Sequence, residues 1–322
     1  MDGTLRLPVS RSPRPSVPPL RRAALAIACL VVATTSAACG EDPNRAAATK
    51  DLAGLIVLTE DSGRSRLTTF DAAGQARSQG GAGGPTAWIS AGLRGTLVAT
   101  MADGSLRLSD RIRNDHDAAW KRVPTPRADM PTDPIYFATW APNGNRFAGL
   151  ATDFGGASPL SLVIVDPLAD TTLIRPIPGL PLPAPPAWLD DSRLLVETKA
   201  GAIVVDVDSG EITAGPDIGG GALVDVSADG SRAAVGRSEP GPVEIRKRDE
   251  WLNGGGQPEA SLGNGTVGAV ALDRRAERLA VIWQQSSRAG IVIVYRRDGG
   301  WHETSRLPLP NGSERGALAW LP

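Results

Sequence analysis

Residues 137–148 read FATWAPNGNRFA: an apolar segment that ends in Trp140, a short polar turn at Asn143 and Gly144, and a second apolar segment from Phe147. A glycine at this place supplies the positive φ that a tight hairpin turn needs. The stretch therefore predicts two short antiparallel strands joined by a hairpin.

The same pattern returns twice further along the chain. Residues 187–196 read AWLDDSRLLV, and residues 224–235 read VDVSADGSRAAV. A third apolar segment, rich in β-branched residues, follows each of the three hairpins, at residues 162–165, 202–205 and 243–245. A more polar segment comes next. Each repeat therefore predicts four antiparallel strands with a polar outer edge.

Markers of the innermost strand place such a repeat along the whole of residues 51–322. They are Trp88, Trp140, Trp188, Val226, Leu272 and Trp320, which follow one another at 38 to 52 residues. Repeats of this length are typical of β-propeller blades. Because no room for three further strands remains after Trp320, we expect the C-terminal strand to pair with the N-terminal blade. That pairing would close an all-β ring of six four-stranded antiparallel blades.

The repeated pattern resembles the TolB-like and WD-repeat-like (WD40-like) propellers of bacterial envelope proteins. Residues 140–148 carry the resemblance best, whereas residues 273–275, Asp-Arg-Arg, depart from it at the turn. The resemblance implies a β-propeller over residues 51–322. It implies no activity, because similar propellers serve as binding scaffolds, hydrolase appendages or enzymes.

The N-terminal segment has the layout of an export signal peptide. Arg21 and Arg22 precede the uncharged residues 23–38, which end in small side chains, and Cys39 follows directly. This order resembles the lipobox of bacterial lipoproteins, although Ser36 stands where that family usually has Leu. The resemblance implies that Cys39 becomes the lipidated first residue of the mature chain.

On this interpretation the chain has three parts. Residues 1–38 are an export signal of the lipoprotein type, residues 39–50 are a flexible tether, and residues 51–322 are the propeller. The second cysteine, Cys29, would be removed with the signal, so Cys39 would be the one remaining thiol and no intrachain disulfide would form.

Other routes stay open. An uncleaved membrane anchor is disfavoured, because residues 23–38 fall short of the roughly 20 apolar residues that a spanning helix needs. Ordinary secretion with cleavage before Cys39 is a second alternative. The pair Arg21-Arg22 also leaves twin-arginine export open beside the general secretory route.

The charge balance bears on the partners. The formal net charge is −1 at pH 7, and because residues 1–38 carry a net charge of +4, the remaining chain has a net charge of about −5. A mildly acidic body without clustered Lys and Arg is not expected to bind nucleic acid. We expect a monomer at the outer face of the cytoplasmic membrane, held by the lipid on Cys39 and bound to a protein partner of the cell envelope.

The sequence offers little catalytic chemistry. His116 lies in a polar stretch and His302 on an outer strand, without a convergent set of partners. No Gly-x-Ser-x-Gly motif and no zinc-type spacing of Cys and His occurs. Residues 206–210, DVDSG, lack the distal Glu of a calcium loop and read as a hairpin turn. We expect no cofactor and no metal.

Four residues are candidates for a binding surface. Asp225 and Asp273 are the carboxylates near the innermost strands, while Trp251 and Trp301 fall outside the marker position. We expect the marker tryptophans to fill the wedges between neighbouring sheets. The favoured function is a non-catalytic protein- or ligand-binding module. The alternative is a propeller-type hydrolase, lactonase-like or sugar-acting, with a channel site; convergence of Asp225 and Asp273 around a cation would favour it.

Overall fold

The computed structural model describes residues 50–61, 64–110, 119–123, 134–152, 160–180, 182–286, 289–310 and 316–322. The predicted export signal, Cys39 and nearly all of the predicted tether lie outside the described residues, as does His116. Among the described residues no helix is both long and apolar enough to span a lipid bilayer.

The described strands form four antiparallel sheets of four strands and one of seven. The first sheet has the order β23 (Ala317–Trp320), β1 (Leu55–Asp61), β2 (Arg64–Phe70) and β3 (Ala76–Gly80). The second holds β4 (Thr86–Ala91), β5 (Leu97–Met101), β6 (Leu106–Ser109) and β7 (Trp120–Arg122). The third holds β8 (Ile135–Trp140), β9 (Phe147–Ala151), β10 (Ser161–Asp166) and β11 (Thr171–Pro176). The fourth holds β12 (Ala187–Trp188), β13 (Arg193–Thr198), β14 (Gly201–Asp206) and β15 (Ile212–Ala214).

The seven-stranded sheet is two units joined through one long strand. Its order is β16 (Ala222–Val226), β17 (Arg232–Arg237), β18 (Gly241–Lys247), β19 (Ala260–Leu272), β20 (Arg278–Ser286), β21 (Ala289–Arg297) and β22 (Trp301–Pro308). The short helix α2 (Arg248–Leu252) lies between β18 and β19. The first half of β19 pairs with β18 and its second half pairs with β20.

The hairpin predicted from residues 137–148 is formed by β8 and β9. Trp140 lies opposite Phe147, and the backbone N–H of Ala141 donates to the carbonyl of Arg146 at 2.9 Å. Gly144 has φ +66°, and a Cβ there would come within 2.8 Å of the Leu93 side chain. Both the turn conformation and the neighbouring hairpin therefore require glycine.

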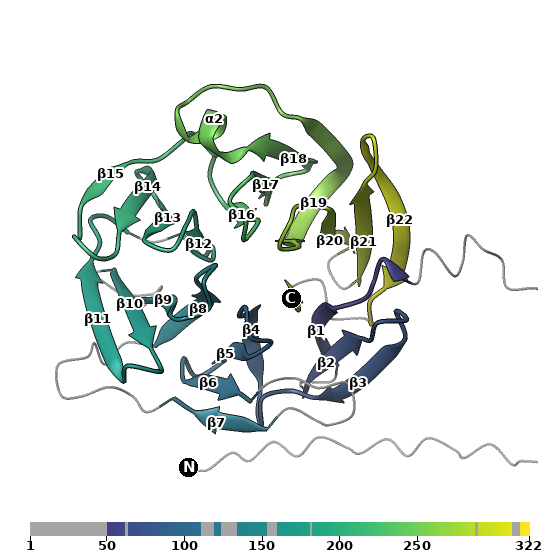
Figure 1. Cartoon of the computed structure of the whole chain (residues 1–322), viewed down its shortest axis with the longest axis horizontal. Helices are drawn as coiled ribbons and strands as arrows, with labels where there is room; N and C mark the ends of the chain where they lie inside the picture. Colours follow the sequence, from purple (N-terminus) through teal and green to yellow (C-terminus); the bar gives the residue numbers. More distant parts are fainter. Residues whose placement is uncertain are drawn as a thin grey trace, which may run out of the picture. The chain divides into compact units, whose positions relative to one another are not determined.

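The first strands of the repeats lie around a common centre (Figure 1). Strands β4, β8, β12, β16, β19 and β23 each contact the next in this order, and β23 contacts β4. The C-terminal strand β23 pairs with β1, with Trp320 opposite Leu55 and Ala317 opposite Leu58. The predicted pairing of the C-terminal strand with the N-terminal blade is therefore confirmed.

Large aromatic side chains fill the wedges between neighbouring sheets. Trp140, Trp188 and Trp320 are all buried, and each belongs to a core cluster that combines residues of two sheets. Trp140 packs with Val98 of the β4–β7 sheet, and Trp188 packs with Ala148 of the β8–β11 sheet. The predicted role of these three tryptophans in the core is confirmed.

Trp88 does not share the register of the other marker tryptophans. The β4 residue equivalent to Trp140 is Ala91, which lies opposite Leu97, whereas Trp88 lies opposite Thr100. Small residues stand at the end of β4 because the ring of Trp140 fills that space: a Cβ on Gly92 would lie 3.0 Å from Trp140 Cδ2. The prediction of one shared position was wrong for Trp88.

Candidate functional site

A pocket lies at the ends of the innermost strands, where these strands turn into their hairpins. Its volume is about 150 Å³, and it is partly open to solvent. Residues of β4, β8, β12, β16, β19 and β23 all line it. Most of the side chains that line it are apolar and include Trp88, Trp140, Trp188 and Trp320, while polar atoms make up about as much of its surface as apolar atoms do. Concave sites that combine apolar side chains with polar groups are typical of small-molecule pockets.

Asp225 is the acidic side chain among the described residues that line this pocket. Its Oδ2 accepts a hydrogen bond from the backbone N–H of Leu272 at 2.7 Å, so it links β16 to β19. Burial raises the pKa of Asp225 to about 7, although backbone N–H groups of Leu272 and Val226 act in the opposite direction. Its carboxyl group is therefore partly protonated near neutral pH.

The same kind of link joins other innermost strands. Ser90, at the position of β4 that corresponds to Asp225 on β16, accepts a hydrogen bond from the backbone N–H of Trp140 at 3.1 Å. The hydroxyl of Thr139 donates to the carbonyl of Pro186 at 3.1 Å. Side chains thus bond neighbouring sheets at this level of the pocket, and a serine is sufficient for the link that Asp225 makes.

The tryptophan indoles differ in how their N–H groups are used. Nε1 of Trp188 donates to the carbonyl of Thr139, and Nε1 of Trp320 donates to the carbonyl of Ala271, both at 2.9 Å. Nε1 of Trp88 and of Trp140 are buried and have no hydrogen-bond partner among the described residues. Two residues of the pocket lining therefore have an indole N–H that is not bonded within the described residues. Leaving a buried donor without a partner costs free energy.

Asp273 does not join Asp225 in the pocket. It follows the last residue of β19 and forms an ion pair with Arg278, with 3.0 Å between Asp273 Oδ2 and Arg278 Nε. Its Oδ1 accepts the backbone N–H of Glu277 at 2.8 Å. Asp273 does lie next to an innermost strand, as the sequence indicates, but one residue beyond β19 its carboxylate caps the hairpin turn and does not line the pocket.

The two off-register tryptophans are not an open stacking surface. Trp251 lies on α2, is 4% exposed and packs in a core cluster with Leu189 and Val226. Its predicted exposure was wrong, because the loop after β18 forms a helix that buries the indole. Trp301, at the start of β22, is partly buried against the cluster that contains Trp283, and its Nε1 is buried without a partner among the described residues.

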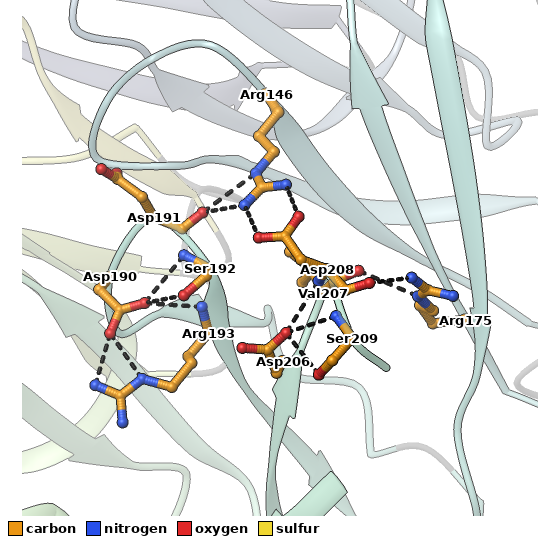
Figure 2. Close-up of polar contacts among 10 residues, drawn as sticks. All are labelled: Arg146, Arg175, Asp190, Asp191, Ser192, Arg193, Asp206, Val207, Asp208 and Ser209. Atoms are coloured by element: carbon orange, nitrogen blue, oxygen red, sulfur yellow. Dashed lines mark hydrogen bonds and ion pairs between the residues drawn. The ribbon is translucent and has the colours of Figure 1, made fainter. Parts of the chain in front are cut away.

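Charged residues at the hairpin turns bind one another (Figure 2). The guanidinium of Arg146 donates to both carboxylate oxygens of Asp208, at 2.6 and 3.0 Å, and also to the backbone carbonyl of Asp191. Arg175 donates to the carbonyls of Asp208 at 2.6 Å and Val207 at 3.1 Å. These bonds connect the β8–β11 sheet with the β12–β15 sheet. The hydrogen bond from Arg146 holds the pKa of Asp208 below its usual range.

The turn after β14 uses its own carboxylate. Asp206 Oδ1 accepts the backbone N–H groups of Asp208 and Ser209, at 3.1 and 2.8 Å, and the Ser209 hydroxyl at 2.8 Å. The prediction that this stretch is a hairpin turn is confirmed. Among the described residues no group of three or more His, Cys, Asp or Glu side chains is placed to hold a metal ion.

Comparisons with known proteins bear on the fold. No protein-family profile matches the sequence, and no curated protein matches it. TolB from Acinetobacter baumannii is similar in structure, with a TM-score of 0.61, 12% identity and coverage of 83% of this chain and 67% of that chain. A putative TolB from Agrobacterium tumefaciens has a TM-score of 0.54 and 13% identity, with coverage of 83% and 98%.

A eukaryotic domain is similar as well. The β-propeller domain of Cps50 (Swd1) from Myceliophteria thermophila has a TM-score of 0.51 and 16% identity, with coverage of 79% of this chain and 83% of that chain. Likeness at such low identity bears on the fold alone. Together with the antiparallel sheets and the ring of contacts between innermost strands, it shows that the described part of the chain has a β-propeller fold similar to that of TolB and of the Cps50 (Swd1) domain.

Proposed function

We propose that this chain is a lipid-anchored, extracytoplasmic six-bladed β-propeller that binds a protein partner at the mouth of its pocket and catalyses no reaction. The observation that carries the proposal is the rigid mouth. Inner hairpins surround an open pocket, and neighbouring hairpins are fixed to one another, for instance by the bond from Asn143 N–H to Asp191 Oδ1 at 2.9 Å. A surface ordered before binding loses less entropy when a partner docks.

Three observations support six blades. Five repeats begin at β4, β8, β12, β16 and the second half of β19, and a sixth contains β23, β1, β2 and β3. The innermost strands of these repeats contact one another in a closed order. The start of the domain is also bound to the repeat that contains β20 and β21. Arg278 donates to the carbonyl of Ala53 at 2.7 Å, and Arg296 forms an ion pair with Asp51 at 3.0 Å.

The anchor belongs to the proposal through the sequence. We infer that residues 1–38 direct export, that Cys39 carries the lipid, and that residues 39–50 tether residues 51–322 to the outer face of the cytoplasmic membrane. Burial of Leu52, which is 6% exposed, supports a domain that begins close to residue 51. The protein would act as a monomer with a protein partner of the envelope and without nucleic acid.

The hydrolase alternative has less support. A lactonase-like or sugar-acting site would need a second acid or a histidine near Asp225. Asp273 is bound to Arg278. His302 lies on β22, the outermost strand of its sheet, opposite Arg296 of β21. Neither residue lines the pocket. We therefore favour binding over catalysis.

Site-specific photo-crosslinking in cells tests the proposal. A photoreactive residue replaces Ala228, which is exposed at the pocket mouth, and in a matched control it replaces Lys199, which is exposed in the hairpin at the opposite end of the strands. We expect the residue at position 228, and not the one at position 199, to crosslink to a protein of the envelope. We also expect the propeller protein to be found in the membrane fraction and to leave it when Cys39→Ala is introduced. Equal crosslinking from both positions would contradict binding at the mouth, and full membrane retention of Cys39→Ala would contradict lipid anchoring.

A further inference from the structure

The negative charge of Asp225 exceeds what its structural role requires. Its bond to the Leu272 N–H repeats the bond that the uncharged Ser90 makes to Trp140 on another innermost strand. The corresponding position is alanine on three other innermost strands, at Ala187, Ala271 and Ala319. A carboxylate among apolar side chains is costly to ionise. A cation bound beside it would make its ionisation far more favourable.

The opposite wall of the pocket is aromatic. In the order of contacts around the centre, β16 is three strands away from β4, and the two strands lie across the centre from each other (Figure 1). Asp225 on β16 and the tryptophans Trp88 on β4 and Trp140 on β8 therefore line the pocket from different sides, with one oxygen of Asp225 bonded to the Leu272 N–H of β19. Trp88 is only partly buried, so part of its ring is open to the pocket.

We propose that this pocket binds a small organic amine, whose ammonium group pairs with Asp225 and whose apolar or aromatic body packs against Trp88 and Trp140. The site goes beyond the proposed function and rests neither on the lipid anchor nor on a protein partner. Tryptophan rings attract cations as well as apolar groups, so they suit both ends of such a molecule. A pocket of about 150 Å³ has the size of a cavity that holds benzene, so a small amine of that size fits it.

Other ligand classes fit this pocket less well. A metal ion needs several oxygen ligands, and Asp225 is the acidic side chain among the described lining residues. A sugar needs many polar partners, and the hydroxyl groups of Ser90 and Thr139 are already bonded to backbone groups of neighbouring strands. Arg274 also lines the pocket, but it is exposed at the turn after β19, where solvent screens its charge.

Calorimetric titration of the purified protein with benzylamine and with uncharged benzyl alcohol tests the site. The variant Asp225→Ser keeps the link to Leu272 in the manner of Ser90 and removes the charge, and Asp225→Asn keeps the shape. The exposed Asp298→Ser is the matched control. At pH 8 we expect either change at Asp225 to weaken benzylamine binding at least tenfold, or about 1.4 kcal/mol. Benzyl alcohol binding and the control variant should show no such change.

A second measurement needs no variant. Below pH 7 an ammonium group must displace the proton of Asp225 to pair with it, so benzylamine binding at pH 6 should release protons, as detected in two buffers of different ionisation enthalpy. Arg274 is the other charged side chain of the described lining. The amine site is overturned if benzylamine does not bind at millimolar concentration, releases no proton at pH 6, or binds Asp225→Ser as well as the parent protein.

Discussion

Asp208 at the rim and Asp225 in the pocket both connect neighbouring repeats, and they do so in opposite ways. The side chain of Asp208 is 59% exposed and binds Arg146 through both oxygens, which lowers its pKa. Asp225 accepts backbone N–H groups and has no ion pair among the described residues, and burial raises its pKa to about 7. Pairing with a cation stabilises the ionised form of a surface carboxylate. Burial in a channel without a cation favours the neutral form.

The difference separates residues that hold the fold together from residues that are free to bind. At the rim, the charged groups are already bonded within the protein: Arg146 binds Asp208 and a backbone carbonyl, and Arg175 binds backbone carbonyls. In the pocket, Asp225 forms no ion pair with any of the described residues. A group in a cavity whose pKa is strongly shifted is a better candidate for function than a group in a dense ion-pair network, because the network has a structural role that accounts for its charges.

The largest expected effect breaks the rim and the pocket together. Trp188 lines the pocket, its Nε1 bonds the Thr139 carbonyl, and the guanidinium of Arg146 lies 5.7 Å from its ring centroid. We expect Trp188→Ala to reduce the free energy of unfolding by about 3–5 kcal/mol, because a buried aromatic side chain leaves a cavity. Chemical denaturation measures the loss.

Trp301→Ala is the control for that variant. Trp301 is only partly buried at the outer edge of its sheet and its indole N–H already lacks a partner among the described residues, so its removal should cost clearly less. An equal loss for the two variants would mean that the wedge between the sheets contributes no more than the outer edge.

The next effect is a change in pH dependence. The folded pKa of Asp225 lies near 7 and its ordinary value is 3.8, so between these pH values the folded chain keeps a proton that the unfolded chain has lost. Stability therefore falls as pH rises through this window, by at most about 1.4 kcal/mol per pH unit for one group. We expect Asp225→Asn, which cannot ionise, to flatten the decline measured by denaturation between pH 5 and pH 8.

Some decline should remain in Asp225→Asn. Burial also raises the pKa of Glu197, despite backbone bonds from Gly221 and Ala222, so this group acts with the same sign. The double variant with Glu197→Gln should be flatter still. If Asp225→Asn kept the full slope of the parent protein, the carboxyl of Asp225 would be solvated like a surface group.

The strands and the ring order could be predicted from the sequence, because short apolar segments and turn residues act locally. The hairpin around Gly144 and the pairing of β23 with β1 are examples. The site could be predicted only in part. Asp225 was identified as a carboxylate near the innermost strands, whereas the position of Asp273 depends on where β19 ends, one residue earlier.

Two further misses have tertiary causes. Trp251 was a candidate for the binding surface because it falls outside the marker position, yet α2 turns the indole inward against Leu189 and Val226. Trp88 was assigned to the wrong register because tryptophan is the most conspicuous residue of β4, while the wedge there is filled by Trp140 from the next sheet. Which side chain fills a shared space depends on both neighbours, and neither sequence segment contains that information alone.

The smallest expected effect sharpens the comparison at the rim. The double-mutant cycle of Arg146→Ala and Asp208→Ala should give a coupling of about 0.5–1 kcal/mol at pH 7, since Asp208 is exposed and solvent screens the pair. The equivalent cycle for Lys247 and Glu250, whose side chains are 60% and 53% exposed, should give less.

The coupling at the rim should respond to acid in the direction opposite to that of Asp225. Because Arg146 lowers the folded pKa of Asp208, the stabilisation is complete above the ordinary value of 3.8 and is lost as pH falls through the lowered value. Denaturation of the four proteins of the cycle at pH 7 and at pH 3 measures this change. A coupling that grew on acidification would show that hydrogen bonds of the protonated carboxyl, rather than the ion pair, join the two sheets at this point.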